Sequence, residues 1–210
     1  MKNKIPNHLN NLSEQLSART SAIIDDSKSW RIDFKVNPDD LPSDNVYVFN
    51  VEQAQIRTDW YLNTANMADD ATVIFNISNS DNNTIDFTQS NLYLDNSSDP
   101  LSAYFNKGSA NDTPPLQVLY NFYGASQLNL NTDLYGSILA PNADIVASPS
   151  VIWGQVIGKS WQGNMQINYN AFTPVGSNIP TIAEPNILWL FMATLIVLII
   201  GRLYLGNPHK

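Results

Sequence analysis

The stretch that decides the fold runs from Val118 to Phe172. It reads VLYNFYGASQLNLNTDLY, then GSILAPNADIVASPSVIW, then GQVIGKSWQGNMQINYNAF. Set out in this way, it falls into turns of about 18 residues, and Gly136 and Gly154 open the second and third turns. A short repeating period indicates stacked supersecondary units, and short apolar runs broken by Asn, Pro, Ser and Gly are typical of β-solenoid coils. We therefore predict a mainly β, β-solenoid (β-helix-like) domain, with a β-sandwich of evenly spaced hairpins as the alternative.

An apolar pair recurs at the same place in successive turns. It is Ile138-Leu139 in the second turn and Val156-Ile157 in the third. Stacked coils bury equivalent positions against one another. The predicted solenoid core is therefore Ile138, Leu139, Ile145, Val146, Val156 and Ile157.

One amphipathic helix and a series of short strands are predicted before this stretch. Residues 6–18 place Leu9, Leu12 and Leu16 on one helical stripe, which we expect to pack on the sheet. A polar run over residues 95–115 predicts a long surface loop. Alternating or β-branched runs predict strands over residues 30–36, 46–51, 55–62, 72–77, 84–87 and 92–94.

Composition excludes several classes of function. The net charge is −8, from 11 basic and 19 acidic residues, and no basic cluster stands in the body of the chain. Phosphate binding needs clustered Lys and Arg, so we expect no nucleic-acid partner. The chain has no cysteine, which excludes disulfides and thiolate metal sites.

No grouping of residues predicts catalysis. The two histidines, His8 and His209, lie near opposite ends of the chain, so neither is placed to act as a general base beside a nucleophile. Adjacent acidic pairs favour solvated turns, because neighbouring residues on a strand point to opposite faces. We therefore predict no enzyme and no cofactor. A loose calcium site at Asp95 and Asp99 remains an open alternative. A carbohydrate-binding platform at Trp153 and Trp161 is another, although tryptophans are more often core residues.

The C-terminal tail is a separate element. Residues 187–200 carry no charge, and the apolar run extends to residue 205 with Arg202 as its one charge. This length and hydropathy are typical of a transmembrane helix. We expect a β domain over residues 1–172, a linker over 173–186, a transmembrane or sorting helix over 187–205 and a polar tail over 206–210.

Three short motifs and a closing phenylalanine carry a resemblance to a known family. The pattern NF-x-x-A, G-x-I-L-A-P-x-A, G-x-V-I and F resembles the choice-of-anchor A domain of secreted bacterial proteins. That resemblance implies an extracellular, surface-associated domain without established chemistry. The Gly-x-Ile-Leu-Ala rhythm also resembles ice-binding β-solenoid proteins. The matching residues are Asn121, Phe122, Ala125, Gly136, Ile138, Leu139, Ala140, Pro141, Ala143, Gly154, Val156, Ile157 and Phe172.

The residues before the tail carry a second resemblance. Glu184 and Pro185, then an apolar run and Arg202, resemble the PEP-CTERM sorting tail of Gram-negative bacteria. Ala183 stands where that family has its first proline. The resemblance implies processing by an exosortase-type enzyme and a domain outside the cytoplasm.

Two expectations follow for the whole chain. The first is a membrane- or surface-anchored adhesion or structural module associated with exopolysaccharide or biofilm matrix. Its alternatives are an ice-binding solenoid and, further off, a polysaccharide-acting enzyme. An ice-binding face would need regular Thr or Ser, whereas the outward candidates are mixed: Asn129, Asn131, Asp144, Ser148, Ser150 and Gln155. The second expectation is an upstream segment with a signal peptide and further strands, because no secretory signal follows Met1.

Overall fold

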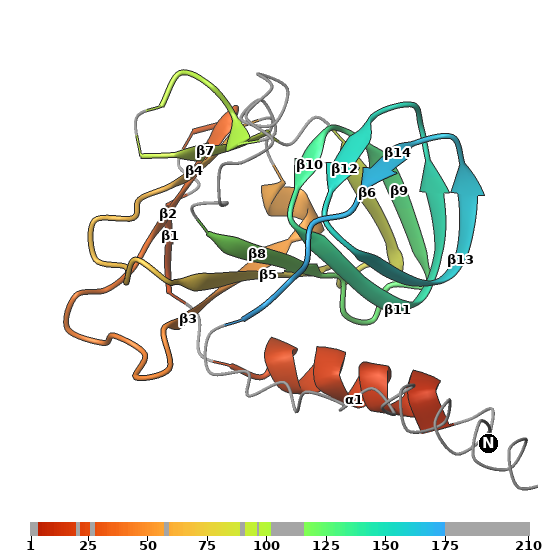
Figure 1. The fold of residues 1–210 in the computed structure, drawn as a ribbon, viewed down its shortest axis with the longest axis horizontal. Coiled ribbons are helices and arrows are strands. Elements are labelled where there is room, and N and C mark those ends of the chain that lie inside the picture. The colour runs from red at the N-terminus through yellow and green to blue at the C-terminus, as the bar shows by residue number, and fades with distance from the viewer. Residues whose placement is uncertain are drawn as a thin grey trace, which may run out of the picture. The chain divides into compact units, whose positions relative to one another are not determined.

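The computed structural model describes residues 4–19, 22–25, 28–56, 59–88, 91–95, 97–101 and 116–174. These residues form one α-helix and a set of short strands (Figure 1). The elements are α1 (Lys4–Ser17), β1 (Ile23–Asp25), β2 (Arg31–Lys35), β3 (Val46–Glu52), the 3₁₀ turn Gln53–Gln55, β4 (Asp59–Leu62), β5 (Thr72–Ser78), β6 (Thr84–Thr88), β7 (Asn91–Leu94), β8 (Gln117–Asn121), β9 (Gln127–Asn131), β10 (Leu134–Tyr135), β11 (Ser137–Ala147), β12 (Val151–Trp153), β13 (Val156–Gly163) and β14 (Gln166–Asn168).

From β10 onward successive strands alternate between two sheets, and the chain winds through the sheets coil by coil. The sheet orders are β1-β2-β4-β7, then β10-β12-β14, then β3-β5-β8-β11-β9-β6 with β13 on the free side of β11. Apart from the antiparallel pair β1–β2, the strand pairs of the described residues are parallel. The fold is therefore mainly β and solenoid-like, with a curled parallel sheet, as the sequence predicts.

The strand register confirms the repeat between Val118 and Phe172. Ile138 lies beside Tyr120 on one side and beside Val156 on the other, so neighbouring coils are offset by 18 residues there. β11 turns a corner at Pro141–Asn142, and the register with β13 shifts between Ala140 and Asp144. As a result the first half of β11 pairs with β8 and the second half with β9.

Aromatic side chains fill the interior of the early coils. Phe34, Phe49, Trp60 and Phe75 are at most 1% exposed, and Phe34 lies 5.1 Å from Trp60 and 4.9 Å from Phe75 between ring centroids. These separations are typical of favourable aromatic pairs. From β11 onward the interior is filled by smaller residues, such as Ile138, Ala143, Ile145 and Ile152.

Three of the six residues predicted for the solenoid core lie outside the interior of the coils. Ile138 and Ile145 are buried inside, but Leu139 is buried on the outer side of the sheet, beneath α1. Val146 and Ile157 are 41% and 39% exposed, so their predicted burial is wrong. Adjacent residues of a strand point to opposite faces, so an apolar pair cannot place both members in one core. Val156 is half-buried and packs on the interior cluster.

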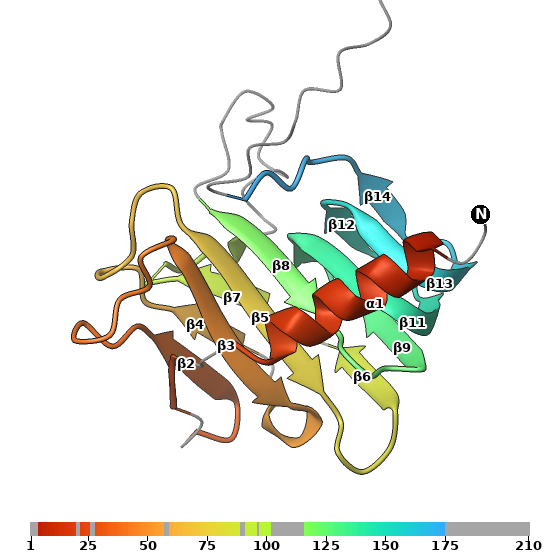
Figure 2. The ribbon, with the colours of Figure 1, turned by 90° about the horizontal axis from the view of Figure 1, so that it is seen from below.

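Helix α1 crosses the outer side of the sheet, over β3, β5, β8 and β11 (Figure 2). Leu9 and Leu16 pack on an outer cluster made by Val48, Ile74, Leu119 and Leu139. The predicted burial of Leu12 is wrong, because Leu12 is 37% exposed. Ser13, one position further along the helix, faces the sheet instead and is 3% exposed.

A polar ladder of Asn50, Asn76, Asn121 and Ser13 fixes the helix to three neighbouring strands. Asn76 Nδ2 donates to Asn50 Oδ1 (2.8 Å) and to the Leu16 carbonyl (2.9 Å). Asn121 Nδ2 donates to Asn76 Oδ1 (2.8 Å) and to the Ser13 carbonyl (2.9 Å), while Ser13 Oγ donates to Asn121 Oδ1 (2.6 Å). Buried polar groups that bond one another hold a unique arrangement, so this ladder sets where the helix lies.

Among the described residues, no helix has the length and apolar character needed to cross a bilayer. The predicted transmembrane or sorting helix at 187–205 and the sorting residues Ala183, Glu184, Pro185 and Arg202 lie outside the described residues.

Candidate functional site

The residues of the family-like motif have structural positions in the coils. Asn121, Phe122 and Ala125 are at most 1% exposed, and Asn121 belongs to the polar ladder. Phe172 packs on the outer cluster beneath α1, and Pro141 lies at the corner of β11. Buried positions of this kind support the fold and present no group to a ligand. The other buried members are Gly136, Ile138, Leu139, Ala140, Ala143 and Gly154, while Val156 is half-buried and Ile157 exposed.

The two period-marking glycines allow neighbouring coils to approach closely. Gly136 has φ of 125°, a conformation that favours glycine. A Cβ on Gly154 would lie 2.1 Å from the Gly136 carbonyl oxygen, so only glycine fits at this contact. Both residues are therefore required by coil stacking and not by a phosphate or another ligand.

The most regular exposed surface is the outer side of β6, β9, β11 and β13, which we call the polar face. Two rows of side chains cross these four parallel strands in register. Parallel strands lie about 4.8 Å apart, so the rows form an even grid. The first row is Thr84, Gln127, Asp144 and Ser160, and the second is Asp86, Asn129, Val146 and Gln162.

Hydrogen bonds along β9 and between β9 and β6 fix the orientation of these side chains. Asn129 Nδ2 donates to Asp86 Oδ1 (2.6 Å), and Gln127 Nε2 donates to Asn129 Oδ1 (3.0 Å). Behind them, Gln53 Oε1 accepts from the Asp86 backbone N–H (3.0 Å). Carboxylate and amide groups that are already oriented lose little conformational entropy when a ligand binds.

A lysine and a serine neutralise and orient the carboxylate of the first row. Lys159 Nζ lies 2.8 Å from Asp144 Oδ2, and Ser160 Oγ donates to Asp144 Oδ1 (2.6 Å). The hydrogen bond from Lys159, helped by the one from Ser160, holds the pKa of Asp144 below its ordinary value. Asp144 is therefore an ionised hydrogen-bond acceptor at neutral pH.

The outer side of β2, β4 and β7 carries a stack of planar groups. The Arg31 guanidinium lies 3.6 Å from the centroid of the Tyr61 ring, and Tyr61 stacks on Tyr93 with centroids 4.7 Å apart. Burial raises the pKa of Tyr93, with a smaller contribution from Asp59. Because Arg31 and Tyr93 occupy both faces of Tyr61, that ring cannot stack on a sugar.

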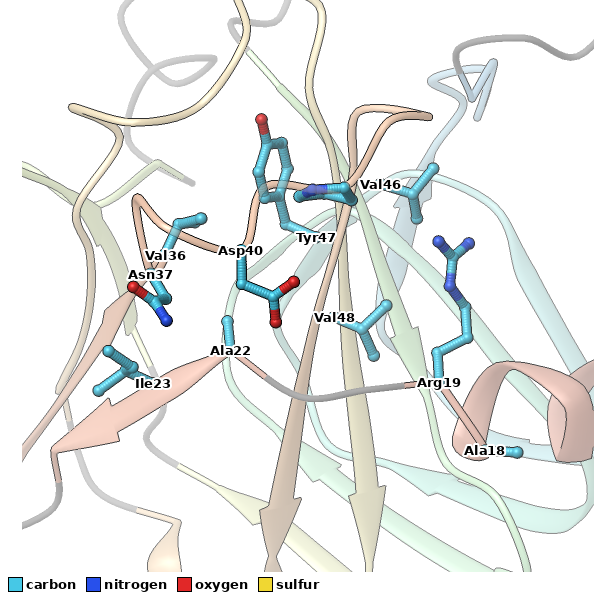
Figure 3. Close-up of a pocket in the computed structure, with 11 residues that line it drawn as sticks. Ala18, Arg19, Ala22, Ile23, Val36, Asn37, Asp40, Val46, Tyr47 and Val48 are labelled. Carbon is cyan, nitrogen blue, oxygen red and sulfur yellow. The ribbon is translucent and has the colours of Figure 1, made fainter.

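A hollow of about 510 Å³ lies beside β3, and Figure 3 shows Arg19 on one side of it and Asn37 on the other. Its lining combines aliphatic side chains, such as Val36 and Val48, with the polar side chains of Arg19, Asn37, Asp40 and Tyr47. The polar groups around it serve local structure: Arg19 pairs with Asp44 at 2.7 Å, and Asn37 Oδ1 accepts from the Asp39 N–H (3.2 Å).

Burial raises the pKa of Asp44, but the hydrogen bonds from Arg19 and from the Val46 N–H outweigh that effect, so the pKa lies below its ordinary value. The hollow is therefore a weaker candidate than the polar face.

The residues considered for metal binding and catalysis are dispersed. The part of the chain that the structure describes contains no group of three or more His, Asp or Glu side chains that could hold a metal ion. Asp95 instead accepts from the Thr64 N–H (2.8 Å) and from Thr64 Oγ1 (2.9 Å). His8 lies exposed on α1, and His209 falls outside the described residues.

Trp153 and Trp161 do not form one platform. Trp153 is half-buried against the interior cluster, and Trp161 is 36% exposed on β13.

A family model identifies the class of domain. The model described as "Putative Ice-binding-like adhesive domain" matches residues 2–169. This range is most of the chain, so the chain belongs to that family of ice-binding-like adhesive domains. No match was found among curated proteins, and none was found among solved structures.

Sequence reasoning found part of the polar face. Asn129 and Asp144 were expected to point outward, and they do. Asp86 was missed because the sequence shows no obvious period before Val118. Gln127 and Gln162 were missed because the strands of this face are offset by 17 and 16 residues, and the 18-residue repeat does not align them. The signal that finds them is strand register: once β6 and β13 are aligned with β9 and β11, the residues at the same two positions of the four strands are polar, except for Val146 on β11.

Proposed function

We propose that this chain is a non-catalytic surface adhesion domain whose polar face binds a neutral, hydroxyl-rich polysaccharide. Membership of the adhesive-domain family carries the adhesive part of the proposal. The oriented amide and carboxylate grid carries the choice of surface and ligand. The proposal assigns the domain no reaction and no cofactor.

The chemistry of the polar face favours a neutral polyol. Asp86 and Asn129 offer adjacent acceptors and donors, which suit vicinal hydroxyl groups that both donate and accept. The chain has a net charge of −8, and Lys159 beside the face is paired with Asp144, so an anionic polymer would be repelled. The exposed side chain of Val146 adds an apolar contact in the second row.

The cellular setting is part of the same proposal. We place the β domain outside the cytoplasm of a Gram-negative bacterium, in exopolysaccharide or biofilm matrix, with residues 187–205 as the membrane anchor. The resemblance of the motif residues to choice-of-anchor A domains supports this setting. The resemblance of Glu184, Pro185 and Arg202 to a PEP-CTERM tail supports sorting by an exosortase-type enzyme.

Ice binding is the second candidate, and the family description favours it. An ice-binding face needs regularly spaced small hydroxyl side chains without charge. The polar face instead carries Asp86 and Asp144, and its two rows contain Thr84 and Ser160 as their hydroxyl side chains. We therefore rank polysaccharide adhesion first, and thermal hysteresis of the purified protein separates the two.

The test compares face variants with a matched control. Full-length protein is incubated with immobilised neutral exopolysaccharide, and the bound fraction is measured. We expect Asn129→Ala with Gln127→Ala to lower affinity at least tenfold, because both oriented amides are lost. Asn66→Ala, which removes an exposed amide in a turn after β4, should bind like the parent. Equal binding by the double variant, or thermal hysteresis without polysaccharide binding, would overturn the proposal.

A further inference from the structure

The end of the solenoid formed by β13 and β14 exposes large apolar side chains. Ile157, Trp161, Ile167 and Tyr169 are 39%, 36%, 46% and 77% exposed. Along β13, every residue after Val156 is exposed. Among the described residues, β13 pairs with β11 alone, so its other edge is free.

Trp161 and Ile167 continue interior rows of the solenoid without a further coil to cover them. Trp161 aligns with Ile145, which is 1% exposed, and Ile167 aligns with Ile152, which is 0% exposed. β14 adds a further strand beside β12, but the chain then runs back. The Phe172 N–H donates to Gln155 Oε1 (3.4 Å) and the Thr173 N–H donates to Gln117 Oε1 (2.9 Å).

The free edge lacks the features that usually prevent strand pairing. β13 reads VIGKSWQG, with no proline and one charge. That charge, on Lys159, is paired with Asp144 of the neighbouring strand. Natural edge strands are normally protected by prolines, unpaired charges or short length, so an edge of this kind is available for pairing.

Charge and shape indicate a second copy as the partner. The chain has a net charge of −8, yet β13 and β14 carry no acidic residue, so two copies meeting at this end escape the repulsion between the rest of their surfaces.

The end of the solenoid is also stepped: β14 is the last strand of one sheet, beside β12, and β13 is the last strand of the other, beside β11. The stepped ends of two copies fit each other when the copies are related by a twofold axis perpendicular to the coil stack.

We propose that two copies of this chain associate end to end through β13 and β14 as a twofold-symmetric dimer. The axis reverses the strand direction, so the two β13 edges pair antiparallel near Trp161. Trp161 then packs near the partner's Trp161, and the two interior cores become continuous. Twofold dimers of this isologous kind are the commonest oligomers, and an aromatic side chain at the centre is typical of a strong interface.

The test is the oligomeric state of the full-length protein in detergent micelles by sedimentation velocity. We expect a monomer–dimer equilibrium that Trp161→Lys shifts to monomer by at least tenfold in Kd. Val146→Lys is the matched control, because Val146 is 41% exposed but lies on the polar face. Far-ultraviolet circular dichroism checks that both variants keep their β structure.

Disulfide trapping gives an independent readout, since the chain has no native cysteine. Gln162→Cys lies beside the proposed axis and should form a disulfide-linked dimer under mild oxidation. Thr84→Cys, three strands away on β6, should not. Three results would each overturn the proposal: a wild-type monomer at every soluble concentration, a dimer that Trp161→Lys leaves unchanged, or the same trapping at both cysteines. The second result would place the interface elsewhere, including in residues 175–210.

Discussion

At the residue scale, Gly154 shows how closely the coils approach. Gly154 has no side chain, so the Gly136 carbonyl oxygen can lie only 2.1 Å from the position that a Cβ of residue 154 would occupy. The sequence predicts the importance of this glycine from its 18-residue repeat, but it could not distinguish a tight coil contact from a turn that needs positive φ. Gly136 is the case with positive φ, and Gly154 is the case of close approach.

Gly154→Ala should destabilise the domain strongly. The clash involves backbone on both sides and cannot be relieved by a rotamer change, so we expect a loss of about 3 kcal/mol or more in the free energy of unfolding. Gly124→Ala is the control, because nothing lies within 4 Å of its Cβ and only its φ of 72° opposes the change. That strain costs about 1 kcal/mol. Equal losses in chemical denaturation would contradict the tight coil contact.

Asp144 should titrate below the ordinary aspartate range. Its pKa is lowered in the folded protein by Lys159 and then by Ser160, so its contribution to stability is complete above the unfolded-state pKa of about 3.9. That contribution is lost as the pH falls through the lower, folded-state pKa. Carboxyl chemical shifts measured by NMR against pH should show the Asp144 pKa rising towards its ordinary value in Lys159→Ala. An unchanged Asp144 titration in that variant would show that the ion pair does not form in solution.

At the scale of elements, helix α1 shows what a periodic pattern can and cannot determine. The leucine spacing predicts a helix over residues 6–18, and the structure has one over Lys4–Ser17. The pattern could not set the rotation of the helix, because Leu12 and Ser13 are both near the stripe. The buried amide of Asn121 decides it: Asn121 needs a polar partner, and Ser13 supplies one while Leu12 cannot.

Two leucine variants test this rotation. Leu16→Ala removes a side chain packed on the outer cluster and should cost about 2 kcal/mol, at the low end for buried leucines because Leu16 is only half-buried. Leu12→Ala removes an exposed side chain and should change stability by less than about 0.5 kcal/mol. Thermal or urea unfolding measures both, and a larger effect at Leu12 would show that the helix is rotated towards the leucine stripe.

A double-mutant cycle tests the polar ladder. Asn121→Ala leaves Asn76 Oδ1 without its donor and the Ser13 hydroxyl without its acceptor, so we expect a loss of about 2–3 kcal/mol. Ser13→Ala should cost less alone, and the two changes together should cost less than their sum, with a coupling of about 1 kcal/mol. Strict additivity in urea unfolding would mean that the two side chains do not interact.

At the scale of the whole molecule, the sequence predicts the strands better than their arrangement. Runs such as TVIFNI form a strand whatever their partners are, and β5 is where it was expected. Which strands pair is hidden before Val118, because the coils there carry insertions. The register separates Ile32 from Trp60 by 28 residues and Trp60 from Leu92 by 32, against 18 between Leu134 and Ile152. The polar face spans both regions, so only the structure assembles it.

Hydrogen exchange should follow position along the coil stack. β5 and β8 are paired on both sides, whereas β13 is paired on one, so amides of β13 should exchange faster in a monomeric Trp161→Lys variant. In the wild-type dimer, the β13 amides on the free edge should become protected. Equal protection of β8 and β13 in the monomeric variant would mean that the chain itself already covers this edge.

The polar ladder also limits where such a solenoid can gain a coil. One helical turn rises about 5.4 Å, while one coil rises about 4.8 Å, so a helix laid along the stack drifts by about 0.6 Å per coil. Asn76 and Asn121 meet successive turns of α1, but the next residue in their row is Leu139, whose apolar contact tolerates the drift that a hydrogen bond does not. The turns of the helix and the coils of the solenoid therefore stay aligned over only a few repeats. A whole coil inserted between β5 and β8 would move Asn76 and Asn121 out of alignment with the turns of α1. A coil added after β11 would leave that alignment intact.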